Sequence, residues 1–209
     1  MADFTFYTNP MSRGQIARWA LHEAGADYET VLVDWTAKPQ AFLDANPMGK
    51  VPTIVHHAAS GDHAVSEAAA ICLYLAEVLP QAGLGPTDAE RADYLRWTFF
   101  AAGPVEQAIT ARSLGFDPSD SRQQAMAGFG SYDRTVDMLA GHLAANAFVC
   151  GDRFTMADVY VGSHVDWGVG FKSMPERPEF LAYLDRVRAR PAYVRAKEID
   201  NQLIAEMQQ

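Results

Sequence analysis

FTFYTNPMSRGQIARWALHEAG, residues 4–25, predicts a strand, a loop and a helix in succession. The aromatic and β-branched run at 4–7 breaks at Asn9-Pro10, as a strand does where it enters a loop. Apolar residues then recur with the helical period from Ile16 to Leu21, and Ser12 is placed to cap this helix. We therefore expect a β-loop-α unit at the N-terminus.

More strands and helices are expected up to residue 80. The patterns predict strands at 28–33 and 51–55, a short helix within 39–45, a polar hairpin turn near residue 61 and a helix at 67–78. The order is βαβαββα. A segment rich in proline and glycine at 80–86 then indicates a linker.

Beyond residue 87 the strand signals nearly vanish. Helices are expected at about 88–111, 119–145, 155–167, 178–190 and 191–204, separated by glycine and proline. The fold class is therefore α/β plus all-α. We expect one domain over 1–80 and a helix bundle over 87–209.

Composition and net charge argue against several classes of function. The chain has 209 residues, of which 49% are hydrophobic, enough to bury a substantial core. The net charge of −9 opposes phosphate backbones and anionic lipids, so we expect no nucleic-acid or membrane partner. The N-terminus has no leader pattern and no apolar run is long enough to span a bilayer, so we expect a cytoplasmic protein.

Cysteine and histidine suggest neither redox chemistry nor a metal. Cys72 and Cys150 lie far apart in apolar surroundings, and we interpret both as core residues. His56, His57 and His63 flank a hairpin turn without acidic or thiol partners, so we expect solvated loop residues and no metal site.

Three segments in this order resemble the cytosolic glutathione S-transferase family. They are YTNPMSRG at 7–14, NPMGKVPTI at 46–54 and VSEAAAI at 65–71. A fourth, GDRFTMADV at 151–159, is similar to the family's buried helix-capping box, with Thr155 as cap. The resemblance covers nearly the whole chain and implies a thioredoxin-like first domain.

The first segment implies the catalytic residue. In serine-type members the active serine lies five residues after a strand-end tyrosine, and Ser12 follows Tyr7 at that spacing. A hydrogen bond donated by the Ser12 hydroxyl, together with the positive end of the following helix, would stabilise the thiolate of glutathione. Ser12 as a plain helix cap remains the alternative, and Tyr7 is a weaker candidate for the thiol contact.

The other two segments imply the rest of the glutathione site. Val51 and a cis Pro52 would pair with the cysteinyl part of glutathione, while Lys38 and Lys50 would serve its glycine carboxylate; solvated lysines are the alternative. Glu67 would accept from the γ-glutamyl ammonium. The family's usual serine is replaced by Ala68, which removes one hydroxyl donor and leaves the backbone amide.

The resemblance implies a homodimeric detoxification enzyme that adds glutathione to a small hydrophobic electrophile. Peroxide reduction, isomerisation and dehalogenation would use the same thiolate, and a non-catalytic glutathione-binding protein is a further alternative. Trp97, Phe100, Phe116 and Trp167 are expected either to line the second-substrate pocket or to belong to the helical core.

Overall fold

The computed structural model describes residues 2–208, and the chain forms two compact units. The first unit comprises residues up to 85 together with those from 189 onward; the helical unit comprises residues 86–188. This division differs from the expected one, 1–80 and 87–209, in the placement of the last helix. That helix lies with the first unit because it packs against the first helix of the chain.

A four-stranded sheet organises the first unit. Strands β1 (Phe4–Thr8), β2 (Tyr28–Leu32), β3 (Thr53–Ala58) and β4 (Gly61–Ser66) alternate with α1 (Gly14–Ala24), α2 (Gln40–Ala45) and α3 (Ala68–Val78). The sheet order is β2-β1-β3-β4, with β1 and β2 parallel and the other pairs antiparallel. The expected βαβαββα order is confirmed.

The strand β3 begins two residues later than expected. Val51 and Pro52 precede it in a turn, and the ladder starts at Thr53, since proline has no amide hydrogen to donate. The three histidines are likewise on strands β3 and β4 and not in a loop. His56 is half-buried, stacks on Phe4 and bonds to the Tyr74 hydroxyl. His57 bonds to the Asp62 carboxylate at 2.8 Å, so the expectation of solvated loop histidines without acidic partners is wrong for both residues.

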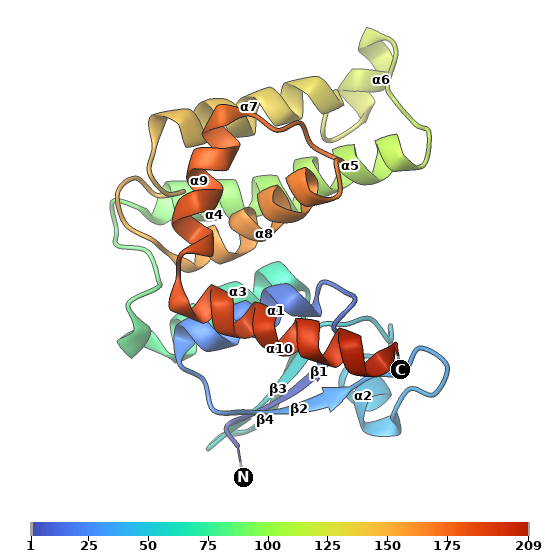
Figure 1. Ribbon diagram of the computed structural model, residues 1–209, viewed down its shortest axis with the longest axis vertical. Coiled ribbons are helices and arrows are strands. Elements are labelled where there is room, and N and C mark those ends of the chain that lie inside the picture. Colours follow the sequence, from blue (N-terminus) through green and yellow to red (C-terminus); the bar gives the residue numbers. More distant parts are fainter. Residues whose placement is uncertain (1, 209) are drawn as a thin grey trace. The chain divides into compact units, whose positions relative to one another are not determined.

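The two faces of the sheet carry different helices. Phe6 is fully buried and lies under the guanidinium of Arg18 on α1. Tyr7, the next residue, points to the opposite face, where its ring lies 5.4 Å from that of Phe42 on α2. Figure 1 shows α1 and α3 together on one side of the sheet.

The last helix, α10 (Pro191–Met207), lies beside α1, as Figure 1 shows. Arg18 Nε donates to Asp200 Oδ1 at 2.8 Å, and both side chains are only 1% exposed. Arg190, just before α10, makes two bonds to the Glu23 carboxylate at 2.6 and 2.7 Å. Charged pairs therefore attach the end of the chain to the first unit.

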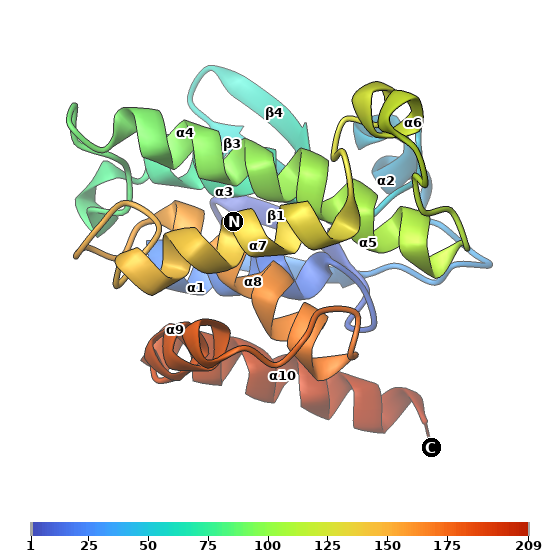
Figure 2. The same cartoon turned by 90° about the horizontal axis from the view of Figure 1, so that it is seen from above.

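The helical unit contains α4 (Arg91–Phe100), a π-helical segment at Ala101–Val105, α5 (Glu106–Ser113), α6 (Ser121–Met126), α7 (Tyr132–Ala145), α8 (Met156–Gly170) and α9 (Pro178–Arg188); a short 3₁₀ turn, Pro80–Ala82, precedes it in the first unit. Figure 2 shows α4 continuing into α5 as one rod beside α7. The π-helical segment surrounds Pro104, whose nitrogen carries no hydrogen, which accounts for the local change of pitch.

The helix expected at 119–145 is two helices, and the expectation of one is wrong. Residues 127–131 separate α6 from α7, with Gly130 at φ 69° and Ser131 accepting from the Arg134 amide as the N-cap of α7. Helix α6 ends at its C-cap residue, Ala127, whose backbone is extended (φ −75°, ψ 122°), and a serine starts the next helix. Among residues 2–208 no helix has both the length and the hydropathy needed to cross a bilayer.

The capping box of α8 is confirmed. Thr155 is the N-cap, and the Asp158 carboxylate accepts from the Thr155 amide at 2.9 Å and from the Val149 amide at 2.7 Å. The hydroxyls of Thr155 and Tyr183 donate to it as well. Burial raises the pKa of Asp158 to about 6, against the lowering effect of these bonds. Four donors therefore depend on one buried acid.

Candidate functional site

Three loops meet at one edge of the sheet in the first unit. In the ladder Tyr7 pairs with Thr53, and Thr53 pairs with Ser66. The chain leaves β1 toward Ser12, enters β3 from Pro52, and leaves β4 toward Glu67. The register therefore brings together three segments that are far apart in the sequence.

Ser12 is half-buried in the loop between β1 and α1. Its hydroxyl donates to the Asn9 carbonyl at 2.6 Å and accepts from the Gly14 amide at 3.0 Å. The N-cap position belongs to Arg13, which makes no side-chain cap bond, so the expected Ser12 cap is displaced by one residue. Ser12 nevertheless satisfies one of the free amides at the positive end of α1.

Gly14 lets this helix start close to the sheet. A Cβ atom at Gly14 would lie 1.9 Å from Thr8 Oγ1 and 3.1 Å from Ser12 Oγ. Any side chain would therefore push the loop away from the end of β1. The absence of a side chain also leaves the Gly14 amide free to reach the serine.

The Val51–Pro52 peptide bond is cis, and the neighbouring lysines differ. Lys38 is half-buried and its Nζ donates to the Gly49 carbonyl at 3.0 Å, which ties it to the turn before Val51. Lys50 is exposed, and its carbonyl accepts from the Thr53 hydroxyl at 3.1 Å. The Lys38 amine therefore lies beside this turn, and the Lys50 backbone forms part of it.

Glu67 has a left-handed backbone, with φ 68° and ψ 118°, which is uncommon for a residue other than glycine. It is exposed and directly precedes α3, which begins at the buried Ala68 and has no side-chain cap. Glu67 is therefore the N-cap residue of a helix whose first amides receive no side-chain cap bond. Such a terminus favours an anionic group.

Tyr7 lies in the core beside the site. It is 8% exposed and packs with Val33 and Phe42 in one hydrophobic cluster. This placement agrees with the interpretation of Tyr7 as a core residue at the rim.

The cysteines offer no second nucleophile here. Cys72 is fully buried on α3, and burial raises the pKa of its thiol, as expected for a core residue. Cys150 is half-buried, so its interpretation as core is wrong; burial raises the pKa of its thiol to about 11. Within residues 2–208 no group of three histidine, cysteine or acidic side chains is placed to hold a metal.

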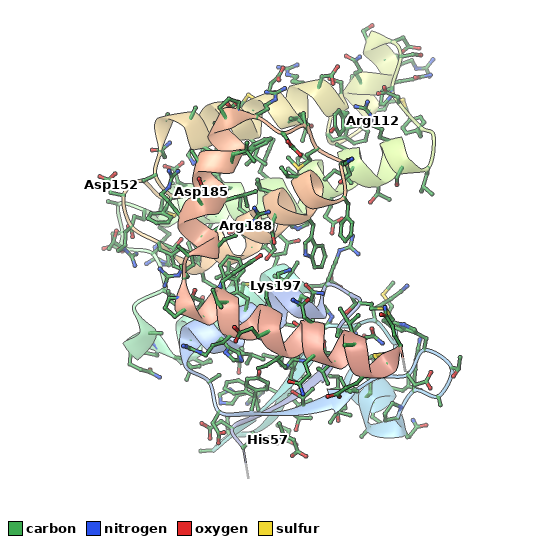
Figure 3. The ribbon with its side chains drawn as sticks, in the orientation of Figure 1. His57, Arg112, Asp152, Asp185, Arg188 and Lys197 are labelled. Carbon is green, nitrogen blue, oxygen red and sulfur yellow. The ribbon has the colours of Figure 1, made fainter. Side chains whose placement is uncertain are left out.

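The helical unit has a cavity of about 780 Å³ among α5, α7, the end of α8 and the loop after it. The Arg112 guanidinium covers one wall by lying 4.1 Å from the centre of the Tyr132 ring, and Figure 3 shows Arg112 on α5. Val169 and Phe171 supply apolar surface. A second cavity of about 450 Å³ is lined by Phe116 and its neighbours.

The four aromatic residues that were expected either to line the second-substrate pocket or to belong to the helical core differ in their surroundings. Trp97 is 3% exposed, contacts the Phe100 ring and stacks on His142 at 3.9 Å, so it belongs to the core. Phe116 is 51% exposed, and Trp167 is half-buried beside Phe171.

Two polar residues of the site were missed in the sequence. Asn9 and Asn46 are both buried and both hold the loops described above through their amides. A signal was present, because each begins the same tripeptide, Asn-Pro-Met.

Known proteins resemble both units. Residues 2–77 match the glutathione S-transferase N-terminal domain and residues 107–186 match the glutathione S-transferase C-terminal domain. Over 214 residues the chain is 29% identical to glutathione S-transferase 3 of Zea mays, covering 92% of each protein.

Two solved structures of glutathione transferases also resemble this chain. A glutathione transferase from Methylococcus capsulatus superposes with a TM-score of 0.74 at 28% identity, over 95% of this chain and 99% of that one. A sphingomonad glutathione S-transferase complexed with glutathione gives a TM-score of 0.73 at 27% identity, over 94% and 98%. The fold, the order of the three loop segments along the chain and both domain matches agree, so the chain belongs to the glutathione S-transferase family.

Proposed function

We propose that the protein is a glutathione transferase that binds glutathione at the sheet edge formed by the loops of Ser12, Val51–Pro52 and Glu67. The observation that carries the proposal is the register, which aligns Tyr7, Thr53 and Ser66 across β1, β3 and β4. Family membership supports glutathione transfer as the activity.

Ser12 activates the thiol by donating a hydrogen bond to the thiolate. In the structure the Ser12 hydroxyl donates to the Asn9 carbonyl. When glutathione binds, this hydrogen bond must be replaced by one from the same hydroxyl to the glutathione sulfur. The exchange is favourable because a thiolate is a charged acceptor and a carbonyl is neutral. The amide of Gly14 keeps the oxygen in place meanwhile. Lowering the thiol pKa by two units corresponds to about 2.7 kcal/mol.

The remaining residues hold the tripeptide. The backbone of Val51, fixed before Pro52, pairs with the cysteinyl part, and Lys38 and Lys50 attract the glycine carboxylate. The bond from Lys38 to the Gly49 carbonyl fixes that amine beside the same turn. Glu67 accepts from the γ-glutamyl ammonium, while the Ala68 amide receives its carboxylate at the start of α3.

The second substrate is a small hydrophobic electrophile. The thiol first loses its proton to solvent, and the thiolate then forms a carbon–sulfur bond to the electrophile. In a substitution the leaving group departs to solvent with its bonding electron pair; in an addition the product takes up a proton from solvent. The cavity between Arg112, Tyr132 and Phe171 is the candidate pocket within the helical unit. A homodimeric, cytoplasmic detoxification enzyme without a metal completes the proposal, and sedimentation that gives only a 22.9 kDa species would contradict the dimer.

The test is the thiolate absorbance of bound glutathione as the pH is raised, in wild type and Ser12→Ala, after calorimetry has measured binding. We expect a thiol pKa well below about 8.5 in wild type and a return toward that value in the variant. Binding with an unshifted pKa in wild type would remove Ser12 from the mechanism.

A second candidate, a glutathione-binding protein without turnover, is favoured by one observation. Helix α3 starts at Ala68 with no side-chain cap, so one hydroxyl donor to the γ-glutamyl carboxylate is missing. Glutathione affinity without turnover on a panel of electrophiles, including hydroperoxides and haloalkanes, would support it. The Ala68→Ser variant should tighten binding by up to about tenfold if the hydroxyl matters.

A further inference from the structure

The tripeptide Asn-Pro-Met occurs twice, at 9–11 and at 46–48. Ser12 directly follows the first copy, and two residues separate the second copy from the Val51–Pro52 pair. Each copy lies at the entrance to one of the loops that form the proposed glutathione site. In both copies the asparagine Oδ1 accepts from the amide two residues on.

Asn9 builds the first turn and is only 2% exposed. Its Oδ1 accepts from the Met11 amide at 3.0 Å, which closes an Asx turn over Pro10. Its Nδ2 donates to the carbonyl of Val33, just past the end of β2, at 3.1 Å. Its backbone carbonyl accepts from the Ser12 hydroxyl. One residue therefore ties the turn, the neighbouring strand and the serine together.

Asn46 builds the second turn in the same way and is 8% exposed. Its Oδ1 accepts from the Met48 amide at 3.2 Å, and its Nδ2 donates to the Lys50 carbonyl at 2.9 Å. Its backbone carbonyl accepts from the residue three positions on, the Gly49 amide, at 2.8 Å. The Lys50 carbonyl is part of the backbone that leads directly into Val51.

Buried amides of this kind hold a loop in one conformation. Each makes both a donor and an acceptor bond to backbone groups, so each fixes the turn on two sides. Proline after each asparagine further restricts the chain, because its φ is preset and the preceding residue avoids the helical region. A site needs its groups held to within a fraction of an ångström.

We propose that Asn9 and Asn46 are paired positioning residues for glutathione, with separable tasks. Asn9 sets the position of the Ser12 hydroxyl and so controls thiol activation. Asn46 sets the Val51 backbone and so controls affinity for the tripeptide. This inference rests on the proposed function, because it takes Ser12 and Val51 as the groups that meet glutathione.

The experiment compares Asn9→Ala, Asn9→Ser, Asn46→Ala and Asn46→Ser with wild type in the full-length protein. Calorimetry gives the Kd of glutathione, thiolate absorbance against pH gives the thiol pKa, and turnover gives kcat and KM. Serine keeps an acceptor for the amide two residues on but is too short to donate to the second carbonyl, and it adds no charge. Urea midpoints report the stability of every variant.

For Asn9→Ala we expect the bound thiol pKa to rise by about one unit, so that the thiolate fraction and kcat at low pH fall about tenfold. Measured at a pH below the bound thiol pKa, where the neutral thiol is the bound form, the Kd should stay within about threefold of wild type. For Asn46→Ala we expect the reverse, a Kd and KM raised about tenfold with the thiol pKa unchanged. The serine variants should recover part of each loss, and they also carry the test if an alanine variant does not fold.

Each asparagine is the control for the other, because both are buried and both close an Asx turn, while Asn46 Nδ2 donates to Thr53 Oγ1 as well as to the Lys50 carbonyl. A merely structural role would lower the urea midpoint of both and leave the thiol pKa and Kd of the folded fraction at wild-type values. That result, or equal effects of both residues on both readouts, would overturn the inference and leave the proposed function intact. Wild type that fails to bind glutathione, or binds it with an unshifted thiol pKa, would instead overturn the proposed function.

Discussion

Replacing Arg18 by methionine should lower the free energy of unfolding by about 3–5 kcal/mol, the usual loss when one partner of a buried ion pair is removed. Arg18 and Asp200 are each 1% exposed, and the bond between them is 2.8 Å long. Methionine keeps much of the apolar stem and removes only the guanidinium. Asp200 would then be a buried acid without its counter-ion.

The loss should also depend on pH. Burial already raises the pKa of Asp200, and Arg18 is the main group that opposes this rise. Without Arg18 the pKa of Asp200 in the folded state rises further above its unfolded value. An acid with a raised pKa binds its proton more tightly when folded, so stability falls as pH increases from the unfolded value through the folded pKa. The slope is at most about 1.4 kcal/mol per pH unit.

Arg18 has other partners, but they are neutral and weaker. Its Nη1 lies 3.3 Å from the Tyr28 hydroxyl and 3.3 Å from Thr30 Oγ1, and the guanidinium lies over the Phe6 ring at 5.2 Å. These contacts add about a kilocalorie each at most to the loss. The charge left on Asp200 therefore dominates the expected magnitude.

The assay is urea unfolding followed by far-ultraviolet circular dichroism at pH 5 and pH 8. The double variant Arg18→Met with Asp200→Leu removes both charges and should lie close to wild type, since apolar replacement of a buried pair is often neutral or stabilising. Arg91→Met is the control, because its pair with Asp88 is exposed and worth about 0.5 kcal/mol at most. A loss below about 1 kcal/mol in Arg18→Met, or equal losses at both pH values, would refute the reasoning.

The remaining predictions concern local contacts. Gly14→Ala places a methyl group 1.9 Å from Thr8 Oγ1, so we expect a loss of about 1–3 kcal/mol in urea, partly recovered by adding Thr8→Ala. Asp158→Ala leaves four donors without an acceptor, and calorimetric unfolding should show a loss of about 3–5 kcal/mol. The Arg153 guanidinium lowers the pKa of Glu90 to about 2, so stability from this pair is present above about pH 4.5 and is lost as pH falls toward 2; urea midpoints of Glu90→Gln should fall less steeply over that range.

Most of the fold was predictable because its signals are local. Alternation over 4–7 and the helical period from Ile16 depend only on neighbouring residues, and both elements form as expected. The capping box of α8 is also local, since Thr155 and Asp158 are three residues apart. Such patterns describe elements well and describe their contacts with distant segments poorly.

The expectations that proved wrong concern features set by a long-range contact or by the backbone conformation of a few residues. The place of α10 depends on Arg18 meeting Asp200, 182 residues away, and nothing in either neighbourhood predicts that pairing. The break before α7 begins at Ala127, where the backbone becomes extended, and includes Gly130 at a positive φ. A glycine within a helical pattern is also tolerated at modest cost, so the break could not be separated from a continuous helix.

The candidate site could be predicted from the sequence only in part. Each of its segments was visible alone, but a serine before a helix or an exposed lysine has a commonplace explanation. Their convergence follows from the ladder, because pairing Tyr7 with Thr53 and Thr53 with Ser66 leaves only one edge where the three loops can meet. The two buried asparagines act at the same loops, because the Oδ1 of each accepts from the amide two residues on. Asn9 Nδ2 donates to the Val33 carbonyl, and Asn46 Nδ2 donates to the Lys50 carbonyl and to Thr53 Oγ1 at the start of β3. Their placement beside the site is explained by the loops that they hold in position.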